Sequence, residues 1–293
     1  MSWFDAARPR GTHPDALAAQ VIVIAKEPRP GRVKTRLTPP FTPQDAASLA
    51  EGALTDTLAA AAAAPMTRHV LALEGAPGDW LPPGFDVIGQ RGGGLDERLA
   101  AAFADTHARL PLPMVLIGMD TPQITPGLLT DAAEALVCGE ADAVFGPAAD
   151  GGFWLLGLRK PDRSLLAGVP MSRQDTGRHQ LDRLTSAGLR VAMMPELTDV
   201  DTVKEAELVA AAIPGSRFAA AFDLAMSGLA PAGVRPWRAL GGFRPPAPGR
   251  LLACRRSGTA RCTAPWSAAA PRSRGSGTSR SCTGRSHAPR RRR

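Results

Sequence analysis

Basic side chains gather in one loop of this sequence, and their types suit the binding of phosphate groups. The loop covers residues 26–37 and reads KEPRPGRVKTRL. Its lysines and arginines offer positive charge and hydrogen-bond donors to phosphate oxygens, and its glycine allows the backbone to turn close to a ligand. It lacks the G-x-x-x-x-G-K-[ST] pattern of a P-loop, and a solvated loop without a ligand is the alternative. The predicted nucleotide-binding residues of this basic loop are Lys26, Gly31, Lys34, Thr35 and Arg36.

Carboxylates follow at two later points in the chain. Asp120 ends the apolar run LIGMD, and Asp199 and Asp201 lie in the segment TDVDT before a predicted helix. Carboxylate oxygens suit Mg²⁺ or Mn²⁺, which can bridge a protein to a diphosphate. We therefore predict Asp120 and Asp201 as metal ligands, with Asp199 as a helix cap. The alternative is that these acids serve only as turn or cap residues.

Two glycine-containing loops could complete such a site. In the segment RGGGLDER, the backbone N–H groups of Gly93 and Gly94 precede a predicted helix, whose N-terminus favours anions, so they could approach a base or a phosphate. In the segment ADGGFW, Asp150 could orient or deprotonate the hydroxyl group of an acceptor. The aromatic residues Phe153 and Trp154 could contact that acceptor, although at least one of them is expected in the core.

The segments that must position these residues alternate between strand and helix patterns. The β-branched run over 21–25 predicts a central strand, because such runs are typical of strands buried on both faces. Further strands are predicted over 69–73, 85–88, 114–118, 143–146, 153–158 and 190–194, and helices over 42–64, 95–109, 127–137, 176–187 and 202–213. This alternation predicts an α/β fold of three layers, with a mostly parallel sheet between helices. Ligands of such sheets bind at the carboxyl ends of the strands, where the basic loop and Asp120 both lie.

The charge of the chain is distributed unevenly. The 293 residues carry a formal net charge of +8, yet residues 228–293 contain 15 Arg and no Lys, Asp or Glu. Residues 1–227 keep the other 20 basic residues against 27 acidic ones, a net charge of −7, so nucleic acid is not an expected partner of this acidic part. We interpret residues 228–293 as a disordered tail. An arginine arm for nucleic acid or an anionic surface, and a translation-frame artefact, are alternatives.

Other classes of protein are not indicated. The N-terminus has no basic and then apolar segment, and no apolar run reaches the roughly 18 residues of a membrane helix. The cysteines lack the paired spacing of a zinc site, and a disulfide framework is not expected. We therefore expect a cytoplasmic protein with no membrane partner, built as an extension over 1–19, a domain over 20–227 and the tail. The sequence does not indicate an oligomeric state.

Four motifs occur together in one order, namely KxPxxGxVKTRL, GMDTP, DGGFWLLG and DVDT. With this ordered set, residues 20–213 resemble a bacterial family of uncharacterised glycosyltransferase-A-like proteins. That family lies in the nucleotide-diphospho-sugar transferase superfamily and is related to the phospholactate guanylyltransferase family. The resemblance implies a Rossmann-like fold of the glycosyltransferase-A type. It also implies nucleotide-phosphate binding by the cations of the basic loop and metal binding by Asp120 and Asp201.

The resemblance leaves three functions to compare. The first is metal-dependent transfer from a nucleotide sugar to a small-molecule acceptor, in which Lys34 helps to neutralise the leaving diphosphate and Asp150 acts on the acceptor. Many glycosyltransferases of this fold carry Asp-x-Asp, but here Gly118 precedes Asp120 by two residues. Nucleotidyltransferases of the superfamily use a single Asp there and a later D-x-D, so transfer from a nucleoside triphosphate with release of pyrophosphate is the second. Nucleotide binding without catalysis is the third.

Overall fold

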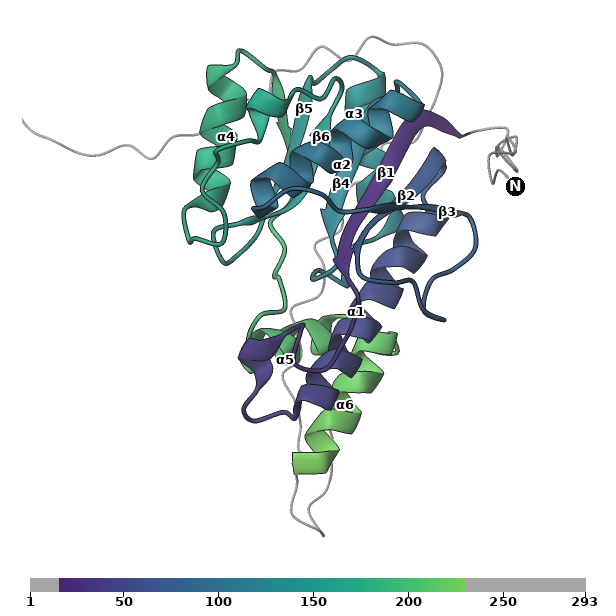
Figure 1. The fold of residues 1–293 in the computed structure, drawn as a ribbon, viewed down its shortest axis with the longest axis vertical. Helices are drawn as coiled ribbons and strands as arrows, with labels where there is room; N and C mark the ends of the chain where they lie inside the picture. The colour runs from purple at the N-terminus through teal and green to yellow at the C-terminus, as the bar shows by residue number, and fades with distance from the viewer. Residues whose placement is uncertain (1–15, 230–293) are drawn as a thin grey trace, which may run out of the picture. The chain divides into compact units, whose positions relative to one another are not determined.

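The computed structural model describes residues 16–229 (Figure 1). All of these residues belong to one compact unit. The predicted tail therefore lies almost entirely outside the described residues, as does most of the predicted extension. The predicted limits of the domain, 20–227, stay a prediction.

Within the described residues, seven strands form one sheet in the order β3-β2-β1-β4-β6-β5-β7. The strands are β1 (Leu17–Lys26), β2 (Met66–Glu74), β3 (Phe85–Gly89), β4 (Met114–Gly118), β5 (Ala143–Pro147), β6 (Phe153–Leu158) and β7 (Val191–Met193). All neighbouring pairs are parallel except those of β6, which runs antiparallel to β4 and β5. The prediction of a mostly parallel sheet is confirmed.

Strand β1 begins at Leu17, four residues before the predicted start at Val21. The sequence signal stops short there because Gln20 interrupts the apolar run. Gln20 is nevertheless fully buried, and its Nε2 donates a hydrogen bond to the carbonyl of Leu110 at 2.8 Å. A buried amide with partners can extend a central strand in this way.

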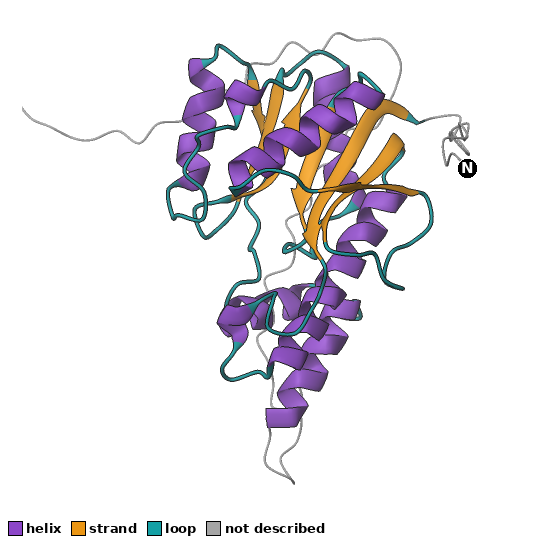
Figure 2. Cartoon of the chain, in the orientation of Figure 1, coloured by secondary structure: helices purple, strands orange, loops and turns teal. Residues whose placement is uncertain are grey.

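Helices cover both faces of the sheet, as the α/β/α prediction requires (Figure 2). The helices on the sheet are α1 (Pro43–Ala63), α2 (Leu95–Arg109), α3 (Pro126–Val137) and α4 (Thr176–Ser186), whereas α5 (Val203–Ala212) and α6 (Arg217–Leu229) pack with α1 in a separate cluster. Because side chains alternate along a strand, Val21 and Val23 of β1 join the core cluster of α1 and α3, while Ile22 joins that of α2 and α4. The three-layer architecture is confirmed.

Helix α6 goes beyond what the sequence pattern indicated, which was a short segment finishing the preceding helix. It is a separate helix of 13 residues, and Phe218 and Phe222 on it are fully buried. Together with residues of α1 and α5 they form a third core cluster, which also contains Leu37 of the basic loop. Tertiary packing therefore makes this helix part of the same unit as the sheet.

Between residues 16 and 229, no helix combines the length and the apolarity needed to cross a membrane.

Candidate functional site

A cavity of about 990 Å³ opens at the carboxyl ends of β1 and β4. This is the edge of the sheet at which the sequence predicted ligand binding. The predicted site residues among its lining are Lys26, Lys34, Thr35, Arg36, Gly93, Asp120, Asp150 and Asp201. Gly31 and Gly94 are not among the lining residues. The cavity therefore collects most of the predicted residues around one space.

Lys34 lies at the centre of an ionic cluster within this cavity. Its Nζ is 2.6 Å from Oδ1 of Asp120 and 3.3 Å from Oδ1 of Asp201. Arg36 binds the other oxygen of Asp201, with Nη1 2.8 Å from Oδ2. The side chain of Lys34 is only 7% exposed, whereas that of Arg36 is 71% exposed. Positive and negative groups from three distant segments therefore meet at one point. We call the carboxylates of Asp120 and Asp201, which Lys34 bridges, the carboxylate pair.

The local backbone explains why Lys34 points into the cluster. Lys34 has a φ of 47°, in the left-handed region that residues other than glycine rarely adopt, and it precedes the short 3-10 turn Thr35–Leu37. The residues on either side are anchored, because Val33 is buried in the core beneath α1 and α3 and Leu37 in the core of α6. Buried neighbours on both sides can hold a residue in such a strained backbone conformation at a functional position.

The segment that carries Asp201 is fastened to the segment that carries Asp120. Three hydrogen bonds join them: Val200 N to Asp120 O at 3.0 Å, Thr121 Oγ1 to Asp199 Oδ1 at 2.6 Å, and Gln123 Nε2 to Thr198 O at 2.7 Å. These bonds fix the separation of the carboxylate pair before any ligand arrives.

The expected capping role of Asp199 is wrong. The N-cap of α5 is Thr202, whose side chain accepts from the N–H of Glu205, and the Glu205 carboxylate accepts from the N–H groups of Asp201 and Thr202. This capping box satisfies the end of the helix without either aspartate. Both carboxylates are therefore left to face other groups.

The electrostatics of the cluster follow from burial and from the crowding of acids. Burial lowers the pKa of the Lys34 ammonium, but the charges of Asp120 and Asp201 outweigh it, and the net result is a raised pKa. Burial raises the pKa of Asp199 to about 6, the Thr121 hydrogen bond opposes this rise, and the charges of Asp120 and Asp150 add to it. The site thus holds a firmly charged lysine beside one carboxyl group that titrates near neutral pH.

Replacing Asp199 with Asn should change how thermal stability depends on pH in metal-free buffer. The folded carboxyl has a pKa of about 6, above its ordinary 3.8, so the bound proton stabilises the native state fully at pH values below 3.8, and this stabilisation is lost as the pH rises through 6. An asparagine carries no charge at any pH. We therefore expect the melting temperature of Asp199→Asn to exceed the wild-type value by more at about pH 7.5 than at about pH 4.5.

The matched control is Asp131→Asn, at an exposed position on α3 outside the cavity. Its melting temperature should follow the wild-type value at both pH values. An Asp199→Asn protein that differs from the wild type equally at both pH values would contradict the raised pKa.

Lys26 lies in the cavity but apart from the ionic cluster. Its Nζ is 3.7 Å from Oε2 of Glu74, and the same carboxylate pairs with Arg98 of α2. Glu74 and Arg98 were not predicted as site residues, since Glu74 ends a strand and nothing in its sequence context indicates a partner 24 residues away. The phosphate-binding role of Lys26 stays a prediction.

One of the glycines before α2 already has its backbone N–H hydrogen-bonded within the protein. The N–H of Gly93 donates to Oε2 of Glu97 at 2.8 Å, and Gly94 is the N-cap residue of the helix. Asp96 and Glu97 lie in the first helical turn, where their charges oppose a bound anion. Nucleotide binding by these glycines stays a prediction, and only Gly93 lines the cavity.

Asp150 borders the cavity in a tight turn. Its Oδ1 accepts from the N–H of Gly152 at 2.8 Å, and the residue is exposed. The turn packs closely on another loop, because a Cβ added at Gly151 would lie 1.8 Å from the carbonyl oxygen of Gln174. Trp154 is buried, which confirms that at least one aromatic residue of this motif belongs to the core.

The loop beside Asp150 was missed by sequence reasoning, since an irregular loop has no periodicity to reveal it. Its cavity-lining residues are Met171, Ser172, Arg173 and Gln174. They lie next to the turn that carries Asp150, because Gly151 of that turn packs against Gln174.

A divalent cation fits the chemistry of the carboxylate pair only with additional ligands. Among residues 16–229, no group of three or more His, Cys, Asp or Glu side chains is arranged to hold a metal ion. Mg²⁺ is commonly bound by one or two carboxylates together with substrate phosphates and water. The oxygen donors of Asp120 and Asp201 fit that kind of binding, in which the remaining ligands come with the nucleotide.

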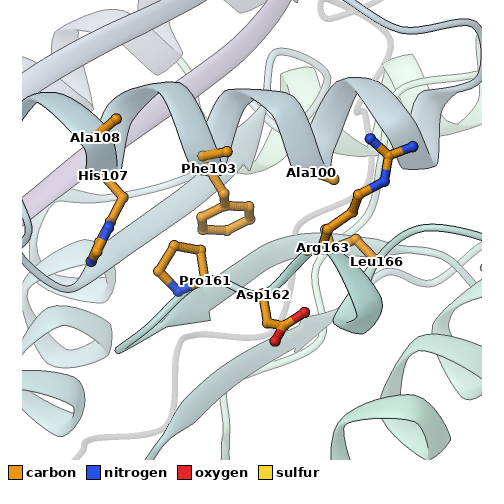
Figure 3. A pocket seen from close by; sticks show the side chains of 9 residues that line it. Ala100, Phe103, His107, Ala108, Pro161, Asp162, Arg163 and Leu166 are labelled. Atoms are coloured by element: carbon orange, nitrogen blue, oxygen red, sulfur yellow. The ribbon is translucent and has the colours of Figure 1, made fainter.

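A second, smaller hollow of about 220 Å³ lies on α2 (Figure 3). Figure 3 shows the ring of Phe103 facing Pro161, with His107 and Arg163 on either side. None of the predicted site residues lines it, and the carboxylate of Asp162 there accepts from the N–H of Ser164 in a local turn. The predicted site residues that line a cavity among the described residues therefore all line the larger one.

Comparison with known proteins agrees with the resemblance seen in the sequence motifs. Residues 50–173 match the sequence profile of a family described as "Uncharacterized protein conserved in bacteria (DUF2064)". This segment includes Asp120 and Asp150, while the basic loop and Asp201 lie outside it. A search of curated proteins gave no match.

One solved structure supports the same fold. A protein from Desulfovibrio desulfuricans G20, provisionally described as a nucleotide-diphospho-sugar transferase, is 27% identical with a TM-score of 0.64, over 71% of this chain and 94% of that one. Rv0371c from Mycobacterium tuberculosis H37Rv is 21% identical over 66% of this chain and 97% of that one. Its manganese complex is 22% identical over 66% and 98%. Both have TM-scores of 0.39, which is too low to support a conclusion about this chain. The predicted resemblance to the superfamily is confirmed.

Proposed function

We propose that this chain is a transferase that binds a nucleotide through its phosphates and a divalent cation, and that it transfers a sugar from a nucleotide sugar to a small-molecule acceptor. The observation that carries the proposal is the meeting of Lys34 and Arg36 with the carboxylate pair at the carboxyl ends of the strands. The similarity to the Desulfovibrio desulfuricans protein supports it.

The phosphates of the donor would bind beside Lys34 and Arg36. During transfer, an acceptor oxygen bonds to the anomeric carbon of the sugar while the bond from that carbon to the phosphate oxygen breaks. The electron pair of the broken bond stays on the nucleoside diphosphate. Lys34 and Arg36 stabilise this developing charge, because cations held beside the leaving phosphates lower its energy. Asp120 and Asp201 would hold a divalent cation, which when bound supplies further charge neutralisation.

The acceptor needs to lose a proton as its oxygen attacks. Asp150 is the proposed group that receives it, because its exposed carboxylate borders the cavity beside the loop with Arg173. The hydrogen bond from Gly152 orients one of its oxygens and leaves the other for the acceptor. No covalent intermediate with the protein is required.

A second candidate reaction is nucleotidyl transfer, and one observation favours it. Gly118 lines the cavity where many glycosyltransferases carry the first aspartate of an Asp-x-Asp pair, so the second carboxylate here comes from Asp201 in another loop. In this reaction a substrate phosphate oxygen bonds to the α-phosphorus of a nucleoside triphosphate. The bond to the β-phosphate breaks, and pyrophosphate leaves.

The products distinguish these reactions. The protein would first be screened by thermal shift against nucleotide sugars and nucleoside di- and triphosphates with and without Mn²⁺, because a ligand that binds only the native state raises the melting temperature. Nucleotides that bind would then be incubated with a panel of acceptors. We expect free nucleoside diphosphate from a nucleotide sugar. Pyrophosphate from a triphosphate would favour nucleotidyl transfer instead, binding without turnover would favour a non-catalytic nucleotide-binding protein, and no nucleotide binding would reject all three.

A further inference from the structure

The ammonium group of Lys34 lies where a cation would bind the carboxylate pair. Its Nζ contacts one oxygen of Asp120 at 2.6 Å and one oxygen of Asp201 at 3.3 Å. Carboxylates of this kind bind divalent cations through the same oxygens. The described structure therefore already contains a positive group at the point where the two acids converge.

A divalent cation and this ammonium group cannot both occupy the pair at low energy. Both are positive, and like charges a few ångströms apart repel strongly when they are shielded from water. The side chain of Lys34 is 7% exposed, so water screens it poorly. Removing the ammonium from the pair therefore favours the metal, and leaving it there opposes the metal.

The ammonium group of Lys34 can move away from the carboxylate pair while the backbone of the loop stays in place. Val33 and Leu37 are buried in two different core clusters on either side of Lys34, which holds the backbone in place. The lysine side chain, in contrast, is a flexible four-carbon chain with a point charge at its end. A bound polyphosphate in the cavity would offer that charge a second anionic partner within reach.

We propose that Lys34 is a built-in counter-cation, which keeps free divalent metal off Asp120 and Asp201 and yields its place to a metal–polyphosphate complex. This inference rests on the proposed function, because it requires a nucleotide whose phosphates accept the ammonium. It adds that metal without polyphosphate binds weakly, because the ammonium group of Lys34 occupies the carboxylate pair. Coupling of this kind between two ligands is typically about 5- to 150-fold in affinity.

The test compares Mn²⁺ binding by calorimetry in buffer without nucleotide or phosphate. We expect Lys34→Met to bind Mn²⁺ at least about tenfold more tightly than the wild type, because the competing charge is gone. Lys34→Arg keeps a charge and should bind as weakly as the wild type. The matched control is Lys160→Met, an exposed lysine outside the cavity, and it should also leave Mn²⁺ binding unchanged. Equal affinity of Lys34→Met and the wild type would overturn the proposal.

Two further experiments test the role of the carboxylate pair and the role of polyphosphate. Adding Asp120→Asn to Lys34→Met should abolish the tighter Mn²⁺ binding, and its persistence would overturn the proposal. In the wild type, pyrophosphate should raise the affinity of the protein for Mn²⁺ by more than the formation of the Mn²⁺–pyrophosphate complex in solution explains. An affinity of the protein for Mn²⁺ that pyrophosphate leaves unchanged would also overturn the proposal.

The variants and probes keep this inference separable from the proposed function. If circular dichroism shows that Lys34→Met is unfolded, Lys34→Gln replaces it with a polar group of similar length, and the same comparison decides. A wild-type protein that binds no nucleotide with Mn²⁺ would reject the proposed function, whereas the comparison of Lys34 variants with Mn²⁺ alone would still read out the role of the ammonium.

Discussion

Asp120→Asn is expected to weaken metal-dependent nucleotide binding by at least about 100-fold, because removing even the outer partners of metal ligands costs about 10- to 100-fold. The amide has nearly the shape of the carboxylate but lacks its charge. It therefore removes one of the two acids available to a cation and leaves Lys34 with Asp201 alone. The measurement is the affinity for a nucleotide found in the thermal-shift screen, with and without Mn²⁺.

Asp131→Asn again serves as the matched control, since it makes the same change at an exposed site on α3. It should bind the nucleotide as the wild type does. Undiminished Mn²⁺-dependent binding by Asp120→Asn would remove Asp120 from the proposed site and leave the proposed function without its central carboxylate.

Phe222→Ala should strongly reduce stability, although Phe222 does not line the cavity. The ring of Phe222 is fully buried and lies edge-on to Phe41, with centroids 6.0 Å apart at 84°. Truncating a buried phenylalanine to alanine costs about 3–5 kcal/mol, because transfer energy is lost and a cavity remains. We expect a loss of this size in the free energy of unfolding, measured by urea denaturation.

Leu224 on the same helix provides the control, because its side chain is 75% exposed. Leu224→Ala changes the helix without opening the core, so its effect should stay within about 0.5 kcal/mol. If the two variants were equally stable, α6 would not be packed against α1 and α5 as described.

The strands and most helices could be predicted because their patterns are local. The run over 21–25 is β-branched and apolar, and Thr42 and Thr125 precede prolines at the starts of α1 and α3, where both threonines cap the helix. The meeting of the basic loop with Asp120 followed from topology, since parallel strands end at one edge. These features needed no knowledge of tertiary contacts.

The features that escaped prediction depend on partners distant in sequence. The burial of Gln20 requires the carbonyl of Leu110, and the hydrogen bond of Thr121 requires Asp199, which is 78 residues away. No periodicity or motif encodes such pairs. The bridging of two acids by Lys34 belongs to the same class, because it depends on a left-handed backbone at a residue type that seldom adopts it.

The anchoring of the basic loop in two separate cores has a mechanical consequence for the site. Val33 is fixed by the packing against the sheet, and Leu37 by the packing of the C-terminal helices. The position of Lys34 relative to Asp120 and Asp201 therefore depends on the packing of both cores. Loosening the packing of α5 and α6, by Phe222→Ala or by warming, would displace the end of the basic loop at Leu37. Nucleotide affinity should then fall before the sheet itself unfolds.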